Sequence, residues 1–233
     1  MTFSENGPDQ VDIPASSIHH TARGPGLLSR TVGRIPGLFS SRFNHESGKV
    51  AYLTFDDGPS SASLVISKML SERRMTATFF LLARKVIEHP ARVHELREAG
   101  HSIGFHGFDH LDAWMVSPSR ILGDLSKGLS VLRNESGEEI TWFRPAFGRI
   151  TPWTKAWAKR EELRVAMWDL NPRDYRKNRK PRAVVGQVIQ DIFPGAVVLL
   201  HDEGRAWKAI ENELPPLLDG LLEMGYKVKG LPN

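Results

Sequence analysis

The chain has 233 residues, of which 40% are hydrophobic and 25% charged, with a net charge of +4 and no cysteine. This length suits one domain with a tail, and the composition is ordinary for a soluble globular protein. The absence of cysteine excludes disulfides and thiolate ligands, so a bound metal ion would need histidine and carboxylate ligands. No apolar run approaches the roughly 18 residues of a membrane span. Residues 1–20 also lack the apolar core of a signal peptide. We therefore expect a cytoplasmic protein without a transmembrane segment.

Residues 1–46 are rich in Ser, Gly, Pro and Arg and are predicted to form a flexible N-terminal extension. Residues 47–233 are predicted to form a single α/β domain. The expected strands, in chain order, lie at 50–54, 76–82, 101–104, 141–143, 163–168, 196–200 and 226–229. The expected helices lie at 61–73, in the segments that end at Gly100, and at 117–133, 152–160, 181–192 and 208–224. Strands that alternate with helices predict a parallel sheet, and about seven repeats predict closure into a (β/α) barrel.

Two adjacent carboxylates, Asp56 and Asp57, follow the first strand and precede a Gly-Pro turn. Neighbouring acids repel each other, and a strand that simply ends does not need both. A metal site can use the pair, because one acid can bind the ion while the other handles a proton. A polar junction between strand and loop is the competing interpretation, and this segment alone does not decide between them.

Two histidines, His106 and His110, follow the short strand that ends near Gly104. Imidazoles four residues apart fall on one side of a helical turn, so we expect a helical turn that lets both bind one ion. One acid and two histidines would leave positions open for water and substrate, as in a catalytic metal site.

Two further strands end in ionisable groups. Arg144 follows the strand at 141–143, and Pro145 restricts it to extended backbone. His201 and Asp202 follow the apolar run at 196–200, which is typical of a buried parallel strand. The carboxyl ends of parallel strands lie on one side of a barrel, so the ionisable residues at these four strand ends are expected to lie close together.

These segments resemble the motifs of the polysaccharide deacetylases (carbohydrate esterase family four, the NodB homology domain). The family includes chitooligosaccharide and peptidoglycan N-acetylglucosamine deacetylases. Five motifs occur in the family order, across roughly residues 48–230: residues 54–59, 106–110, 144–148, 168–175 and 199–202. The resemblance implies a distorted (β/α) barrel of about seven parallel strands and a metal-dependent hydrolase that removes N-acetyl groups from N-acetylglucosamine-containing saccharides.

The resemblance also implies the site residues. The metal ligands would be Asp57, His106 and His110, with Zn²⁺ as the expected ion and Co²⁺ or another first-row metal as alternatives. Asp56 would be the general base, held ionised by Arg144. His201 would be the general acid, oriented by Asp174, with Asp169 of the same motif as the alternative partner.

The remaining implied residues contact the substrate. The backbone N–H of Phe147 would stabilise the oxyanion. Trp168 and Leu199 would form an apolar wall around the acetyl methyl group, and Tyr175 would stack on a sugar ring. The other tryptophans are predicted to pack in the core or between helices: Trp114, Trp142, Trp153, Trp157 and Trp207.

The chain departs from the family pattern at two positions. Gly107 stands where a Ser or Thr hydroxyl usually steadies the metal loop, and Phe147 stands where a tyrosine is usual. The first change is expected to loosen the loop and the second to alter substrate contacts. Neither removes a reacting group.

Other functions stay open beside the saccharide deacetylase. The same fold and metal could cleave a small non-sugar amide or imide, or the chain could be a carbohydrate-binding relative without catalysis. An iron oxygenase with two histidines and one carboxylate is disfavoured, because that chemistry would be expected on an all-β scaffold.

A basic stretch overlaps the end of the fourth motif and continues beyond it: Arg173, Arg176, Lys177, Arg179, Lys180 and Arg182. We interpret it as a solvated loop, with attraction of anionic saccharides as the alternative. No nucleic-acid partner is expected, because the chain has no recognition-helix or single-strand-binding motif.

Overall fold

The computed structural model describes residues 48–232. The predicted extension at residues 1–46 lies outside this part of the chain. The described part forms seven strands: β1 (Val50–Gly58), β2 (Thr78–Leu81), β3 (Ser102–Phe105), β4 (Trp142–Phe143), β5 (Arg164–Val165), β6 (Ala196–His201) and β7 (Lys227–Lys229). All pairings between them are parallel.

The strands form one curled sheet with the order β5-β4-β3-β2-β1-β6, and β7 pairs with β1. β7 pairs with Val50–Tyr52, at the beginning of β1, whereas β2 pairs with the residues from Thr54 to Gly58. A single parallel bridge between Leu170 and Val198 joins the segment after β5 to β6. The sheet therefore curls toward closure, and the predicted distorted barrel of about seven parallel strands is confirmed.

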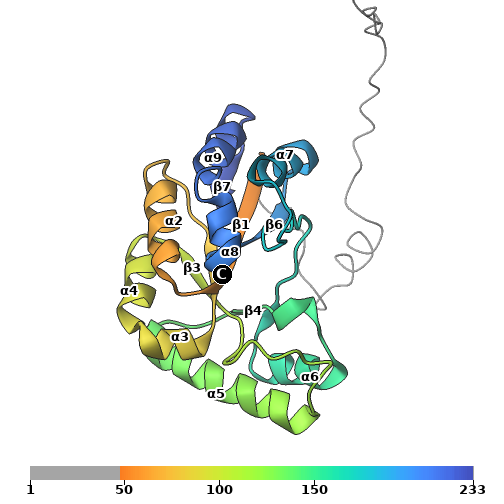
Figure 1. Ribbon diagram of the computed structural model, residues 1–233. Coiled ribbons are helices and arrows are strands. Elements are labelled where there is room, and N and C mark those ends of the chain that lie inside the picture. The colour runs from red at the N-terminus through yellow and green to blue at the C-terminus, as the bar shows by residue number, and fades with distance from the viewer. Residues whose placement is uncertain (1–47, 233) are drawn as a thin grey trace, which may run out of the picture.

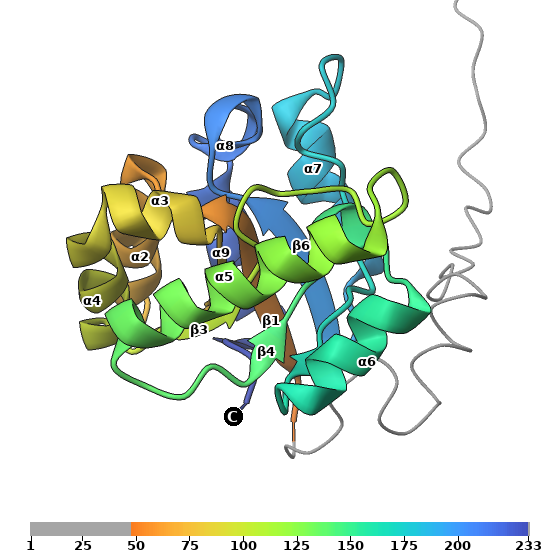
Figure 2. The ribbon, with the colours of Figure 1, turned by 90° about the horizontal axis from the view of Figure 1, so that it is seen from below.

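The helices surround the sheet (Figures 1 and 2). They are α2 (Ser61–Ser71), α3 (Ala83–Glu88), α4 (Pro90–Glu98), α5 (Pro118–Ser136), α6 (Pro152–Arg160), α7 (Pro181–Asp191), α8 (Gly204–Ile210) and α9 (Leu214–Glu223). Three of these helices begin at a residue whose side chain caps the helix. The hydroxyls of Ser60, Ser117 and Thr151 accept hydrogen bonds from backbone N–H groups in the first turns of α2, α5 and α6. None of the described helices is long and apolar enough to cross a membrane.

The central strand β1 is buried along its length because both of its faces are covered. Ala51, Leu53 and Phe55 belong to the large apolar cluster that includes residues of the surrounding helices. Val50 and Tyr52 belong to a smaller cluster with Phe80, Trp142 and Val197. Side chains alternate along a strand, so Asp56 continues the face of Tyr52 and Thr54 into the barrel interior.

Three predicted elements were wrong in extent. The strand predicted at 50–54 continues through Asp56 and Asp57 to Gly58. The helix predicted at 208–224 is two helices, because Pro215 and Pro216 fit only the first turn of a helix and so begin α9. The strand predicted at 163–168 stops at Val165. The carbonyls of Ala166 and Met167 accept hydrogen bonds from the side chain of Arg144 instead of from a neighbouring strand.

The predicted packing role of the tryptophans is correct for only some of them. Trp142 and Trp157 are fully buried, and Trp207 packs against the core while partly exposed. Trp114, in the loop before α5, and Trp153, in the first turn of α6, are exposed instead.

Gly104 is expected to tolerate no side chain, since a Cβ atom there would overlap the ring of Phe80. We predict that Gly104→Ala lowers the free energy of unfolding by about 1–3 kcal/mol, through overpacking. Denaturant unfolding followed by circular dichroism measures the change. The matched control is Gly123→Ala on the exposed face of α5, where nothing lies within 4 Å of the added atom. It should be neutral or stabilising by up to about 1 kcal/mol, and equal effects of both variants would contradict the packing argument.

Candidate active site

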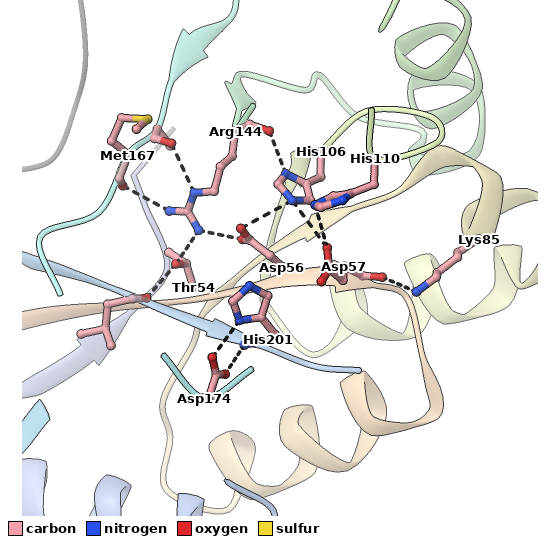
Figure 3. A network of polar contacts seen from close by, with 12 residues as sticks. Thr54, Asp56, Asp57, Lys85, His106, His110, Arg144, Met167, Asp174 and His201 are labelled. Atoms are coloured by element: carbon pink, nitrogen blue, oxygen red, sulfur yellow. Dashed lines mark hydrogen bonds and ion pairs between the residues drawn. The ribbon is translucent and has the colours of Figure 1, made fainter. Parts of the chain in front are cut away.

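The ionisable groups predicted at the strand ends lie together at the carboxyl edge of the sheet (Figure 3). Asp56 and Asp57 are among the last three residues of β1, and His201 ends β6. His106 directly follows β3, and Arg144 directly follows β4. The paired strands bring them into register: Asp56 lies opposite His201 across the β1–β6 pair. Parallel strands thus place groups that are far apart in sequence around one space.

A bulge in β1 allows both acids to face that space. In a regular strand Asp56 and Asp57 would point to opposite faces of the sheet. The register of β1 against β2 shifts between Asp56 and Gly58, and Asp57 has a φ of 81°. A bulge redirects one side chain of a strand, and here Asp57 turns toward His106 and His110.

The expected helical turn at His106–His110 was wrong. The segment is a loop in which Gly107 has a φ of 103° and His110 a φ of 54°, values outside a right-handed helix. The rings still come together, with centroids 5.1 Å apart. The loop is held by Asp124 of α5, whose carboxylate accepts the backbone N–H groups of Phe108 at 3.0 Å and Asp109 at 3.1 Å. These two bonds steady the loop where Gly107 offers no hydroxyl.

Asp57, His106 and His110 fit a divalent metal ion. One ligand atom of each lies within 4.8 Å of the other two. Asp57 Oδ1 is 3.6 Å from His106 Nε2 and 3.4 Å from His110 Nε2. This oxygen is buried without a hydrogen-bond partner among the described residues. Ligands bound at about 2.1 Å with tetrahedral angles are separated by about 3.4 Å, so the spacing suits a shared ion.

The protonation of the histidines also suits a metal. His106 Nδ1 lies 2.7 Å from the carbonyl oxygen of Arg144, which can only accept, so Nδ1 carries the proton and leaves the Nε2 lone pair free. Burial is the largest cause of the lowered pKa of His110, so this ring is also available as a neutral ligand.

Asp56 forms a buried ion pair with Arg144, whose Nη1 donates to Asp56 Oδ1 at 2.7 Å. The two side chains are 4% and 0% exposed. Burial alone would raise the pKa of Asp56, but the charge of Arg144, aided by His106, His201 and the hydrogen bond, lowers it below the ordinary value. Asp56 is therefore a carboxylate whose second oxygen remains available, 3.6 Å from His106 Nε2.

Three further hydrogen bonds hold the Arg144 guanidinium. It donates to the hydroxyl of Thr54 at 2.7 Å and to the carbonyls of Ala166 and Met167 at 3.2 Å each. The group lies 4.1 Å from the centroid of the Phe80 ring. The hydroxyl of Thr54 in turn donates to the carbonyl oxygen of Val198 in β6 at 2.7 Å.

His201 is bonded to Asp174, whereas Asp169 accepts the backbone N–H of Val197. Asp174 is buried and contacts His201 twice, at Nδ1 (2.9 Å) and at the backbone nitrogen (2.8 Å). Burial would lower the pKa of His201, but the hydrogen bond and charge of Asp174, with smaller effects of Asp56 and Asp57, raise it to about 9. The ring is thus protonated at neutral pH.

The groups surround a cleft of about 330 Å³. The four predicted substrate residues line it together with the three candidate metal ligands, Asp56 and His201: Phe147, Trp168, Tyr175 and Leu199. Leu199 is buried and Trp168 half-buried, whereas Phe147 and Tyr175 are exposed. The Tyr175 ring meets His201 edge-on, with centroids 5.2 Å apart. The cleft size is typical of a small-molecule or sugar site.

Three supporting residues were not predicted. Asp124 holds the histidine loop, and Lys85 of α3 donates to the carbonyl of Asp57 at 2.7 Å and forms an ion pair with Glu203. Asp202 is fully buried and accepts a hydrogen bond from Ser63. Burial, with smaller effects of Asp57 and Asp56, raises the pKa of Asp202 to about 7. Of the three, only Asp202 was named from the sequence, as the acid that follows His201 after the apolar run at 196–200, and no supporting role was predicted for it.

The basic stretch after Tyr175 is exposed except for Arg179, in agreement with the predicted solvated loop. Arg179 is half-buried because it bonds back to α7, at the carbonyl of Ala183 (3.0 Å) and the side chain of Gln187 (2.5 Å).

Comparisons with known proteins agree with this arrangement. A family profile described as "Polysaccharide deacetylase" matches residues 44–166. A peptidoglycan-N-acetylglucosamine deacetylase of Bacillus cereus is 30% identical over 196 residues, which cover 80% of this chain and 71% of that protein. The peptidoglycan-N-acetylglucosamine deacetylase PgdA of Listeria monocytogenes is 30% identical over 221 residues, 94% of this chain, but the chain spans only 45% of that protein.

A similar solved structure shows that this fold can occur with or without enzymatic activity. It is a mutant of a Bacillus anthracis pseudoenzyme of the same esterase family, described as having restored enzymatic activity. It is 27% identical, with a TM-score of 0.71, and the match covers 80% of this chain and 67% of that chain. Whether this fold catalyses a reaction therefore depends on the individual site residues.

We predict that Asp124→Ala weakens zinc binding by about 10- to 100-fold, the usual cost of losing a group that orients metal ligands. Without the carboxylate, the N–H groups of Phe108 and Asp109 lose their acceptor and the loop that carries His110 is less ordered. Isothermal titration of metal-free protein with Zn²⁺ measures the change. Glu135→Ala, at the other end of the same helix, is the matched control. An Asp124→Ala isotherm that superimposes on the wild-type one would show that the loop needs no such support.

Proposed function

Because the chain belongs to the polysaccharide deacetylase family, we propose that it is a metal-dependent hydrolase that removes N-acetyl groups from N-acetylglucosamine units of an oligo- or polysaccharide. One observation carries the proposal: three candidate metal ligands, an ionised carboxylate and a protonated imidazole line the same cleft. Amide hydrolysis needs a nucleophile, a base, stabilisation of the oxyanion and an acid for the departing amine.

Asp57, His106 and His110 would hold the ion, for which we propose Zn²⁺ because two imidazoles and a carboxylate suit it. Co²⁺ or another first-row metal would suit the same donors. When bound, such an ion supplies a Lewis acid and lowers the pKa of a coordinated water to about 7.

Asp56 acts as the base. Its Oδ1 is occupied by Arg144, so its second oxygen takes the proton of the water that attacks the acetyl carbonyl. The attack forms a carbon–oxygen bond and moves negative charge to the carbonyl oxygen. The backbone N–H of Phe147 donates to this oxygen, a contact that is typically worth about 3 kcal/mol.

His201 acts as the acid. Its Nδ1–H is bonded to Asp174, so Nε2 carries the proton that passes to the amide nitrogen as the carbon–nitrogen bond breaks. The products are acetate and the free amine of the sugar. Leu199 and Trp168 enclose the acetyl methyl group, and Tyr175 lies at the rim beside His201, where a sugar ring can stack on it.

The test of the proposal is acetate release from N-acetylated chitooligosaccharides, peptidoglycan fragments and small amides. We expect zinc-loaded protein to act on the acetylated sugars, a strong chelator to abolish turnover, and added Zn²⁺ or Co²⁺ to restore it. Turnover that persists after complete removal of metal would exclude the proposed mechanism.

Asp56→Asn is predicted to retain zinc and to lose activity by about 10²- to 10⁴-fold, the usual contribution of a general base. The substitution leaves Arg144 buried without its counter-charge, which costs several kcal/mol of stability. Turnover and zinc content should therefore be measured at a temperature where circular dichroism shows a folded protein. Loss of zinc in step with activity would mean that the roles of Asp56 and Asp57 are reversed.

The pH dependence of kcat/KM is predicted to reflect the pKa of His201, which Asp174 raises. The acid must be protonated, so kcat/KM should fall as pH rises through about 9, the raised pKa of His201. Asp174→Asn removes the charge that raises this pKa, so the alkaline limb should move toward the ordinary histidine value of about 6.5. If the alkaline limb of the kcat/KM profile lies at the same pH in Asp174→Asn as in the wild type, His201 is not the general acid.

A further inference from the structure

Four unpaired cations lie beside the cleft, in the loop between β5 and α7. Residues 171–182 contain six cationic side chains but only one acid, Asp174, which is buried and bonded to His201. Four of the six are exposed and form no ion pair with any residue in the range 48–232; we call them the basic cluster: Arg173, Arg176, Lys177 and Lys180. A run of like charges is most often a solvated surface, so the argument depends on how this loop is held and where it lies.

The loop is ordered by its own hydrogen bonds. The backbone N–H of Arg173 donates to the side chain of Asn171 at 3.0 Å, and the N–H of Arg176 donates to the carbonyl of Arg173 at 3.1 Å. The N–H of Arg179 donates to the carbonyl of Arg176 at 3.1 Å, and the side chain of Arg179 ties the loop to α7. Two successive turns therefore hold the cations close together, in a loop that projects from the body of the domain where it leads into α7 (Figure 2).

The basic cluster begins at the rim of the cleft. Asn171 and Tyr175 both line the cleft. Arg173 lies between these two residues in the chain, and Arg176 directly follows Tyr175. A saccharide whose acetamide occupies the cleft would therefore have a charged substituent within reach of these long side chains.

Cationic side chains elsewhere around the site do have carboxylate partners. Arg84 of α3 lies 3.3 Å from Asp109 in the histidine loop, and Lys85 pairs with Glu203. In the basic cluster, no acid of the described part of the chain offsets the repulsion between neighbouring positive charges. A bound anion would offset it, so the cluster suits a ligand that brings its own negative charge.

The number and type of these side chains match a phosphate better than a carboxylate. A phosphate monoester carries close to two negative charges and three acceptor oxygens, whereas a carboxylate carries one charge and two oxygens. A guanidinium can bind phosphate through two parallel hydrogen bonds, and a lysine adds a point charge. Two arginines and two lysines together therefore suit a phosphate or a diphosphate.

We propose that the basic cluster binds a phosphate group carried by the acetylated saccharide, so that the enzyme prefers a phosphorylated or diphosphate-linked substrate to a neutral one. This inference rests on the proposed deacetylase function and specifies a chemical feature of its substrate. The phosphate belongs either to a soluble sugar phosphate or to the headgroup of a glycolipid, since both offer the same chemistry to the cluster.

The test compares acetate release by zinc-loaded protein from three forms of one sugar: N,N′-diacetylchitobiose, its 1-phosphate, and the disaccharide linked through diphosphate to a lipid in phosphatidylcholine vesicles. Wild-type kcat/KM is expected to be about tenfold higher for the phosphorylated forms, the order of two exposed charge contacts. Because salt screens exposed charges, this advantage should shrink as salt is raised. A further gain of the lipid-linked form over the 1-phosphate indicates a glycolipid, and equal values indicate a soluble sugar phosphate.

Arg176→Gln/Lys177→Gln removes two charges and should lose most of the advantage of the phosphorylated forms, with a much smaller loss on the neutral disaccharide. Arg176→Lys/Lys177→Arg keeps both charges and should retain the advantage. The matched control is Lys159→Gln/Lys227→Gln, which removes two exposed cations at the end of α6 and the start of β7, near the opposite edge of the sheet. It should follow the wild type on all three substrates.

Equal wild-type kcat/KM on the neutral and phosphorylated forms, or an equal loss of the phosphate advantage in the Lys159/Lys227 control, would overturn this inference while leaving the deacetylase function intact. Calorimetric binding of diacetylchitobiose and its 1-phosphate separates the two proposals. If the wild type releases no acetate from any form, the deacetylase proposal fails. Tighter binding of the 1-phosphate that is lost in Arg176→Gln/Lys177→Gln would still support the phosphate site, and equal binding of both sugars would contradict it.

Discussion

The buried ion pair between Asp56 and Arg144 is the interaction on which the site depends. Isolating one charge inside a protein is costly, and removing one partner of such a pair is strongly destabilising. Here three further acceptors surround the guanidinium: the hydroxyl of Thr54 and the carbonyls of Ala166 and Met167. The pair therefore joins β1 to the segment after β5 and keeps Asp56 ionised.

The ion pair with Arg144 also gives Asp56 different surroundings from those of its neighbour Asp57. Asp56 is committed to Arg144, whereas Oδ1 of Asp57 is buried with no hydrogen-bond donor among the described residues and faces two histidine nitrogens. The bulge in β1 makes this difference possible, since without it the two side chains would lie on opposite faces of the sheet. A strand end and one irregular residue thus place the proposed metal ligand beside the proposed base.

The sequence predicted the barrel and the convergence of Asp56, His106 and His201, because apolar strands that end in ionisable groups carry a local signal. It did not predict the loop at His106–His110, where a glycine and a left-handed backbone replaced the expected helical turn. The residues that hold the site in place were also not predicted from the sequence. Asp124 and Lys85 act on backbone groups that are distant in sequence, and such contacts leave no pattern in a single chain.

The division of labour between the two acids is tested most directly by anomalous diffraction at the zinc edge, from crystals of zinc-loaded protein. The account predicts one strong peak at bonding distance, about 2.0–2.2 Å, from Asp57 Oδ1 and from Nε2 of His106 and His110, with Asp56 still paired to Arg144. A peak bound by Asp56 in place of Asp57, or no peak between these residues at full zinc loading, would contradict it.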